Sequence, residues 1–441
     1  MLKKLLSLLL AAVLALSFCS CELVERVRED IRTLRRMADP IETTYPYLEI
    51  EPKEVTYNEG YAPVQSHYSY DVLPLEGERA LYTELVKSYY DISPEKDEEV
   101  GLYPMPEIRL KGYSLSEAEV RTTMKAVSDD YPEIFWPGGT LGFYSDNETT
   151  VVQPYTLYSA QEVDRMIGAV RTAAEEFYAT VPDGLSAYER ELLVHDYLIE
   201  NVAYEESVDL KDASANDPEI YTVYGALVEK KAVCEGYTRA FQMLLNGLGV
   251  DCVGILGSGE NELHIWNAVK LDDTWVQVDA TWDDQEEIYA RYLYFNVTED
   301  YMLRDHTYSK MFTELSEAQI NGYEGDCPAD VMNLFIPKCT DSTLGYYYRE
   351  TPHLSDYDGA AVKSALLKAA EKKDEIFCFY IEDDLDYQEA VTLLFAEYPQ
   401  YFFEYVSSVN NYLEDYSVDN SNISYYPLEQ CRAIAVMLKY Y

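Results

Sequence analysis

Three residues in one stretch of the sequence have the types and the order that thiol catalysis needs: Cys234, His264 and Asp279. A cysteine attacks a carbonyl carbon when a histidine takes its proton, and a carboxylate can fix the tautomer of that imidazole. Such a set performs acyl transfer through a thioester and requires neither a metal nor an organic cofactor. The sequence therefore predicts a catalytic centre in this stretch.

The cysteine is expected at the start of a helix. Apolar residues follow it at steps of three and four: Tyr237, Phe241, Leu244, Leu245 and Leu248. This spacing predicts a helix that begins near Cys234 and ends at Gly247 or Gly249. The free N–H groups and the positive dipole end of a helix N-terminus favour a thiolate, and the same N–H groups suit an oxyanion.

The histidine and the aspartate are expected on neighbouring strands. The pattern predicts the following elements: a strand from Cys252 to Leu256, a turn from Gly257 to Asn261, a strand from His264 to Leu271, a tight turn at Asp272-Asp273 and a strand from Thr274 to Trp282. If Leu271 pairs with Thr274, Asp279 is the diagonal neighbour of His264; if Lys270 pairs with Asp273, the two are directly opposed. Both registers place them on one face, roughly 4.5–8 Å apart at Cβ, whereas a one-residue slip separates them. Trp266 and Trp275 share that face and would shield the pair from water.

The three residues stand in blocks that resemble the transglutaminase-like superfamily, a papain-like group that includes bacterial peptidases and cross-linking transglutaminases. The blocks are G-A-L-V-E-K-K-A-V-C-E-G-Y-T-R-A-F, H-I-W-N-A-V and W-V-Q-V-D-A-T-W-D. The resemblance implies that Cys234 is the nucleophile, His264 the general base and acid, and Asp279 the orienting carboxylate. It also implies an oxyanion side chain from upstream, for which Tyr204 and Tyr224 are both candidates.

The first residues read as an export signal. Residues 1–20 hold two lysines and then an apolar run that is too short to span a bilayer comfortably. The end of the run, L-S-F-C-S-C-E, resembles a bacterial lipoprotein cleavage box, so Cys21 is the expected lipidation site; cleavage before Cys19 and an ordinary cleaved signal peptide are the alternatives. Lipidation would tether the protein to the outer face of the bacterial cell membrane, with residues 21–45 as a charged tether.

Composition limits the partners. The formal net charge is −46, and a surface of that sign repels the phosphates of nucleic acid. The expected partners are therefore a protein, peptide or cell-wall peptide substrate and the membrane. No C-x-x-C spacing indicates zinc, and Cys327 with Cys339 is the one pair that merits testing as a disulfide, while Cys252 and Cys378 are expected to be buried thiols.

The segments on either side of the predicted core resemble each other. A helix followed by Tyr-Pro occurs at Tyr131 and again at Tyr398, and a second match aligns Tyr158 with Tyr426. Each copy is expected to contain a helix, a strand, a helix, short strands and a final helix, which is a small α+β module. The predicted domains are an N-terminal module (46–180), a transglutaminase-like catalytic core (181–312) and a C-terminal module (313–441). The modules serve either substrate recognition or the packing of the core.

Together these patterns predict an α+β protein that acts as a cysteine peptidase or amidase. A cross-linking transglutaminase and a catalytically silent surface binding or scaffold protein are the alternatives. Four further histidines lack a nearby cysteine or base-like context and are interpreted as structural: His67, His195, His306 and His353.

Overall fold

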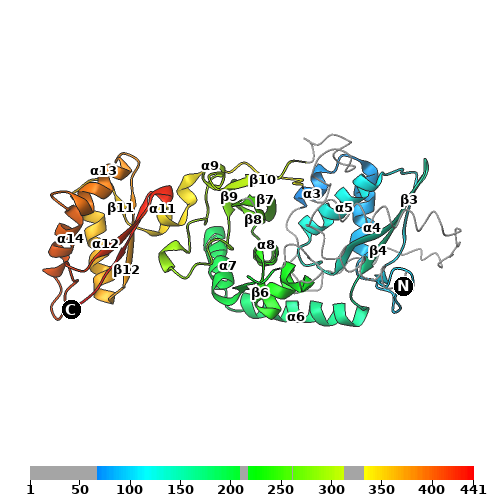
Figure 1. Ribbon diagram of the computed structural model, residues 1–441, viewed down its shortest axis with the longest axis horizontal. Coiled ribbons are helices and arrows are strands. Elements are labelled where there is room, and N and C mark those ends of the chain that lie inside the picture. Colours follow the sequence, from blue (N-terminus) through cyan, green and yellow to red (C-terminus); the bar gives the residue numbers. More distant parts are fainter. Residues whose placement is uncertain (1–66, 209–216, 261, 312–331) are drawn as a thin grey trace. The chain divides into compact units, whose positions relative to one another are not determined.

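The computed structural model describes residues 67–208, 217–260, 262–311 and 332–441 (Figure 1). The chain forms two compact units, of which the larger contains the residues up to Asp273 and Asp305–Pro337. The smaller contains Thr274–Arg304 and Lys338–Tyr441. The predicted signal, tether and lipidation site at Cys21 lie outside the described residues. Within the described part, no helix is both long and apolar enough to cross a membrane.

The larger unit begins with helices that pack on a small antiparallel sheet. Its elements are α3 (Tyr68–Val72), α4 (Glu76–Ser88), β1 (Tyr103–Pro104), β2 (Ile108–Lys111), α5 (Glu117–Asp130), β3 (Pro137–Ser145), β4 (Thr149–Thr156) and α6 (Ala160–Tyr178). Strand β4 is central and pairs antiparallel with β1, β2 and β3. The helices α5 and α6 both begin with a Ser-x-x-Glu capping box, which satisfies N–H groups of their first turns.

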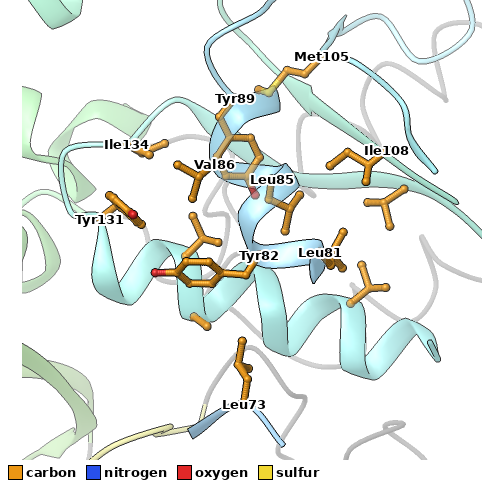
Figure 2. Close-up of a cluster of buried hydrophobic side chains, with 14 of the residues drawn as sticks. Leu73, Leu81, Tyr82, Leu85, Val86, Tyr89, Met105, Ile108, Tyr131 and Ile134 are labelled. Atoms are coloured by element: carbon orange, nitrogen blue, oxygen red, sulfur yellow. The ribbon is translucent and has the colours of Figure 1, made fainter. Parts of the chain in front are cut away.

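A hydrophobic cluster holds these elements together. Figure 2 shows Leu81, Leu85 and Val86 of α4 projecting into it. Met332 and Leu334 are buried in the same cluster, although they lie about two hundred residues further along the chain. Beside them, the amide of Asn333 accepts from the backbone N of Leu256 and donates to its carbonyl, both at 2.8 Å. A distant segment therefore completes this core.

The second half of the larger unit carries Cys234 and His264, two of the three predicted catalytic residues. Its elements are α7 (Ala187–Asn201), β5 (Ala203–Tyr204), the 3-10 helix η2 (Pro218–Tyr221), the π-helix η3 (Gly225–Glu229), β6 (Lys231–Ala232), α8 (Cys234–Gly247), β7 (Cys252–Gly259), β8 (Glu262–Leu271) and β10 (His306–Tyr308). The helix predicted from Cys234 to Gly247 is confirmed. Strand β7 lies between β8 and β10 and is antiparallel to both.

The turn predicted from Gly257 to Asn261 is wrong. Strand β7 continues to Gly259, because β8 pairs with it on one side and β10 on the other. A Cβ atom on Gly257 would collide with the carbonyl oxygen of Thr307, so glycine here permits the close approach of β10 and does not mark a turn. The chain reverses only after Gly259, at Glu260, whose φ is 50°.

The smaller unit contains a four-stranded sheet with helices. Its elements are β9 (Thr274–Val278), η4 (Ile288–Ala290), α9 (Glu299–Met302), η7 (Ser342–Leu344), α11 (Tyr346–Glu350), β11 (His353–Leu354), α12 (Ala360–Lys372), β12 (Ile376–Ile381), α13 (Tyr387–Val391), the π-helix η8 (Thr392–Ala396), α14 (Tyr401–Asn410), β13 (Ser424–Leu428), η9 (Glu429–Cys431) and β14 (Ala433–Met437). The sheet order is β11-β12-β14-β13, with β11 parallel to β12 and the other pairs antiparallel. Phe379 and Phe402 stack in its core at 5.8 Å.

The structure corrects the predicted repeat between the two ends of the chain. Tyr158 precedes helix α6, whereas Tyr426 lies in strand β13 and is followed by β14, so the helix expected there is wrong. The order helix, strand, helix and final hairpin nevertheless occurs twice, with sheet orders β2-β4-β3 and β12-β14-β13 and antiparallel pairing throughout. Helix α14 is extra in the second copy. Kinship of the two modules stays a prediction.

A buried carboxyl group gives the larger unit a pH-dependent stability. Glu133 is 2% exposed, and burial raises its pKa from 4.5 to about 8. The native state thus holds this proton more tightly than the unfolded chain, so its stabilising effect is complete below pH 4.5 and is lost as the pH rises through about 8.

We expect the neutral variant Glu133→Gln to match the wild type in urea unfolding at pH 4 and to exceed its stability at pH 9 by roughly 3–5 kcal/mol, since one pKa unit corresponds to about 1.4 kcal/mol. The measurement is the unfolding midpoint at intervals between these pH values. Parallel profiles for the two proteins would contradict the assignment.

Candidate active site

Two short parallel strands fix the start of helix α8, which begins at Cys234. Strand β6 leads through Val233 into Cys234, and β5 pairs with it so that Tyr204 is opposite Ala232. The backbone N of Glu205 donates to the carbonyl of Ala232 at 2.9 Å, which extends this pairing. Cys234 itself is partly exposed and its thiol is free. The structure therefore places the thiol at an accessible helix N-terminus, as predicted.

A glycine lets the first turn of α8 press against the preceding loop. A Cβ atom on Gly236 would lie 2.6 Å from the carbonyl oxygen of Ile220 and 2.7 Å from the Cβ of Ala232. The backbone N of Val233 also donates to Ile220 at 3.1 Å. The glycine of the Cys-Glu-Gly sequence thus permits a packing that no other residue could keep without movement.

Helix α8 is joined to strand β8 by buried hydrogen bonds. The hydroxyl of Thr238 donates to the carbonyl of Ile265 at 3.0 Å, and the side-chain amide of Asn267 donates to the carbonyl of Thr238 at 3.1 Å. Thr238 stands one helical turn after Cys234, and Ile265 directly follows His264. The structure therefore brings the helix that begins at Cys234 and the strand that bears His264 to one junction.

His264 lies among aromatic rings in the interior. Its side chain is largely buried, and its ring stacks with Trp266 at a centroid distance of 6.0 Å, as the prediction of a shielding tryptophan requires. The ring of His306 is closer, at 5.4 Å, and is also buried. The interpretation of His306 as a merely structural residue missed this contact. Its neighbours in the sequence give no indication of it, because only the pairing of β10 with β7 creates it.

Asp279 belongs to the smaller unit, where it is 1% exposed. Its carboxylate accepts from the backbone N of Thr281 at 3.0 Å and of Trp282 at 3.1 Å. These bonds form a local turn, and strand β9 consequently ends at Val278 instead of reaching Trp282 as expected. The predicted pairing of Asp279 with His264 joins residues of different units and stays a prediction.

The two oxyanion candidates differ in their surroundings. Tyr224 is buried, and its hydroxyl accepts a hydrogen bond from Arg165 at 3.2 Å. Tyr204 is 45% exposed and lies beside the strand that delivers Cys234. The exposure of Tyr204 and its position beside β6 favour it over Tyr224 as the candidate for the oxyanion side chain.

Two side chains of helix α8 donate hydrogen bonds to backbone carbonyls at the end of helix α5. Arg239 of α8 donates to the carbonyl of Ser128 at 2.6 Å, and Gln242 donates to that of Asp129 at 2.7 Å. The last carbonyls of a helix lack partners within it and carry the negative end of its dipole, so they suit an arginine. The N-terminal elements thus contribute directly to the position of α8.

One group of carboxylates has the spacing of a cation site. Ligand atoms of Asp217, Glu219 and Glu229 lie within 4.8 Å of one another. Burial, and then the charge of Glu229, raise the pKa of Glu219 to about 7. The three side chains are exposed or partly exposed, and a shared proton suffices to relieve their repulsion.

Among the other described cysteines, Cys252, Cys339 and Cys378 are free thiols. Cys252 is buried as predicted, and burial raises its pKa well above the usual value. Burial raises the pKa of the Cys378 thiol, which is partly exposed, to about 12. Cys339 is a free buried thiol, and its predicted partner Cys327 lies outside the described residues.

Comparison with known proteins indicates a transglutaminase-like domain. Residues 172–280, which include Cys234, His264 and Asp279, match the model of the Transglutaminase-like superfamily. Kyphoscoliosis peptidase of Mus musculus is 32% identical over 87 residues, which are 17% of this chain and 13% of the mouse protein, so the chain spans a small part of that relative.

Two solved structures are also similar to parts of the chain. One is a TGase with 14% identity, covering 45% of this chain and 56% of that chain at a TM-score of 0.25. The other is described as a candidate cysteine protease from Cytophaga hutchinsonii, with 13% identity, 32% and 61% coverage and a TM-score of 0.21.

Substitution of Gly236 tests the packing at the start of α8. We expect Gly236→Ala to lower the stability by roughly 1–3 kcal/mol, as overpacking of a filled site does, and to slow the alkylation of Cys234. The matched control is Gly168→Ala, also within a helix, where an added Cβ meets nothing within 4 Å. This control should raise the stability by roughly 0.5–1 kcal/mol. Equal effects of the two substitutions on the melting midpoint would refute the close approach.

Proposed function

We propose that this protein is a thiol acyl-transfer enzyme that acts on amide bonds, with Cys234 as the nucleophile, His264 as the base and Asp279 as the orienting carboxylate. The observation that carries the proposal is the junction at Thr238, which joins the helix that begins at the accessible Cys234 to the strand that bears His264. The match of residues 172–280 to the Transglutaminase-like superfamily supports it.

The reaction proceeds in two steps. His264 takes the proton of the Cys234 thiol, and the thiolate adds to the carbonyl carbon of the substrate amide. The tetrahedral oxyanion is held by backbone N–H groups at the start of α8 and by Tyr204. The C–N bond then breaks as the imidazolium of His264 gives its proton to the leaving amine, which leaves a thioester on Cys234. Asp279 stabilises the imidazolium and keeps the ring in the tautomer that receives the proton.

The second nucleophile decides the class of enzyme. If water attacks the thioester, a carboxylic acid leaves and the enzyme is a peptidase or amidase. If a lysine amine attacks, an isopeptide bond forms and the enzyme is a cross-linking transglutaminase. We favour hydrolysis because the mouse relative with the 87-residue match is named a peptidase. The expected substrates are proteins, peptides or cell-wall peptides.

The test combines thiol labelling with product analysis. We expect Cys234 to react with iodoacetamide at pH 7 at least tenfold faster than a free cysteine, since a base that takes its proton and the N–H groups of a helix N-terminus both favour the reactive thiolate, and His264→Ala and Asp279→Asn to slow it. Incubation with a diverse peptide mixture and a labelled primary amine, followed by mass spectrometry, should give cleaved or deamidated peptides. Cys234→Ala is the control, and Tyr204→Phe should lower turnover without slowing alkylation, since only turnover develops an oxyanion.

Each other result points to a different conclusion. Incorporation of the labelled amine that depends on Cys234 would identify a transglutaminase. Alkylation of Cys234 no faster than that of a free thiol, unchanged in His264→Ala, would refute the catalytic proposal in favour of a binding or scaffold protein.

We further propose that Cys21 carries a lipid that anchors the protein to the outer face of the bacterial membrane. The motif L-S-F-C-S-C-E supports this. Expressed in a bacterium, the wild type should sediment with membranes and partition into detergent, and Cys21→Ser should release it. Retention of the Cys21→Ser protein on membranes, with Cys19 intact, would contradict lipidation at Cys21.

A further inference from the structure

The sheet that contains β10, β7 and β8 lacks side chains at two positions of β7, which leaves a gap on the face that carries His264. In the register of β7 with β8, Gly257 is opposite His264 and Gly259 is opposite Glu262. In the register of β10 with β7, Tyr308 is opposite Gly257 and His306 is opposite Gly259. Paired residues of antiparallel strands project to the same face. The middle strand therefore offers two glycines, without side chains, between the side chains of β8 and those of β10.

The rings of the outer strands fill this gap. The centroids of His264 and His306 are 5.4 Å apart across β7, and the two residues offer ring nitrogens within 4.8 Å of each other. The ring of Trp266 contacts the ring of His306 edge to face, with centroids 4.9 Å apart, and stacks with the ring of Tyr308 at a centroid distance of 5.9 Å. A larger residue at position 257 would meet both Trp266 and the backbone of β10. The Gly-Ser-Gly segment of β7 thus allows the base and His306 to touch.

A carboxylate holds His306 in place. Its Nδ1 lies 2.6 Å from Oδ1 of Asp305, and its side chain has no exposed surface. An ionised carboxylate only accepts hydrogen bonds, so Nδ1 carries the proton in this contact. Backbone hydrogen bonds from Ser309 to Leu256, and from Glu260 to Asp305, tie both ends of β10 to β7. The contact with Asp305 therefore fixes the ring orientation of His306 from its own strand and its sequence neighbour.

We infer that His306, held by Asp305, is a positioning residue for the base: its ring restrains the imidazole of His264 through the contact across the glycine gap. The inference rests on the proposed function, in which His264 must keep one orientation to take the proton of Cys234 and return it to the leaving amine. A base that can rotate loses that orientation, and misplacement by about 1 Å can cost two orders of magnitude in rate.

The test uses alkylation of Cys234 by iodoacetamide between pH 5 and 9, which needs no substrate. We expect His306→Ala to lower the rate at pH 7 by roughly tenfold and to displace the acid limb of the pH profile, because freedom of the base weakens its proton transfer. His306→Phe keeps a ring in the gap and should restore the rate to within about threefold, as a packing role predicts. Asp305→Ala should give an intermediate loss.

Matched controls separate positioning from general damage. His353 of the smaller unit makes the same kind of contact, with Nδ1 2.7 Å from Oε1 of Glu382, so His353→Ala removes a comparable pair and should leave the alkylation profile unchanged. Melting midpoints identify any variant that fails to fold.

Two results would overturn the inference. One is a folded His306→Ala protein with the wild-type alkylation profile, and the other is a His306→Phe protein no faster than His306→Ala although it melts at the wild-type temperature. Failure of the proposed function is a separate result, since it requires that His264→Ala itself leave the alkylation of Cys234 unchanged.

Discussion

Two buried hydrogen bonds centred on Thr238 hold the helix of Cys234 against the strand of His264. Each uses a group that would be costly to leave without a partner in the interior, so the junction tolerates little sliding of helix over strand. The proposed nucleophile and base stand on separate elements and need this constraint, because their relative position depends on the packing of two elements and not on one chain segment. The pairing of β5 with β6 and the absence of a side chain at Gly236 then fix where helix α8 starts.

The same helix is also held from outside the matched transglutaminase-like segment. Arg239 and Gln242 bind carbonyls at the end of α5, which belongs to the predicted N-terminal module. The Oε1 atom of Glu235 lies 3.5 Å from Nη2 of Arg239, and burial raises the pKa of the Glu235 carboxyl group. These contacts favour a packing role for the module, because they end on helix α8, which begins at Cys234.

The sequence predicted the elements that depend on local patterns. Apolar spacing identified α8 with its first residue, Cys234. It failed where the partner comes from elsewhere in the chain. Gly257 was interpreted as part of a turn because glycine favours turns, but its role is to admit β10, which lies some fifty residues away.

The residues around the proposed base also differ in whether local sequence patterns reveal them or only the fold does. The order and spacing of Cys234, His264 and Asp279 are legible in the chain, and Trp266 follows from strand alternation. His306 is not, since no periodicity relates it to His264 and only the shared strand β7 brings them into contact. The end of β9 was predicted too late in the sequence. The strand stops because the carboxylate of Asp279 accepts hydrogen bonds from the backbone N of Thr281 and Trp282, and the residue type alone does not show whether an aspartate will form such a turn or lie within a strand.

The burial of Met332 and Leu334 among the N-terminal helices bears on the order in which the protein can fold. That core is complete only when a segment beyond the matched residues 172–280 has joined it, so the N-terminal helices cannot finish packing before Leu334 has been synthesised. Contacts of such long sequence separation slow folding, since a large loop must close before they form.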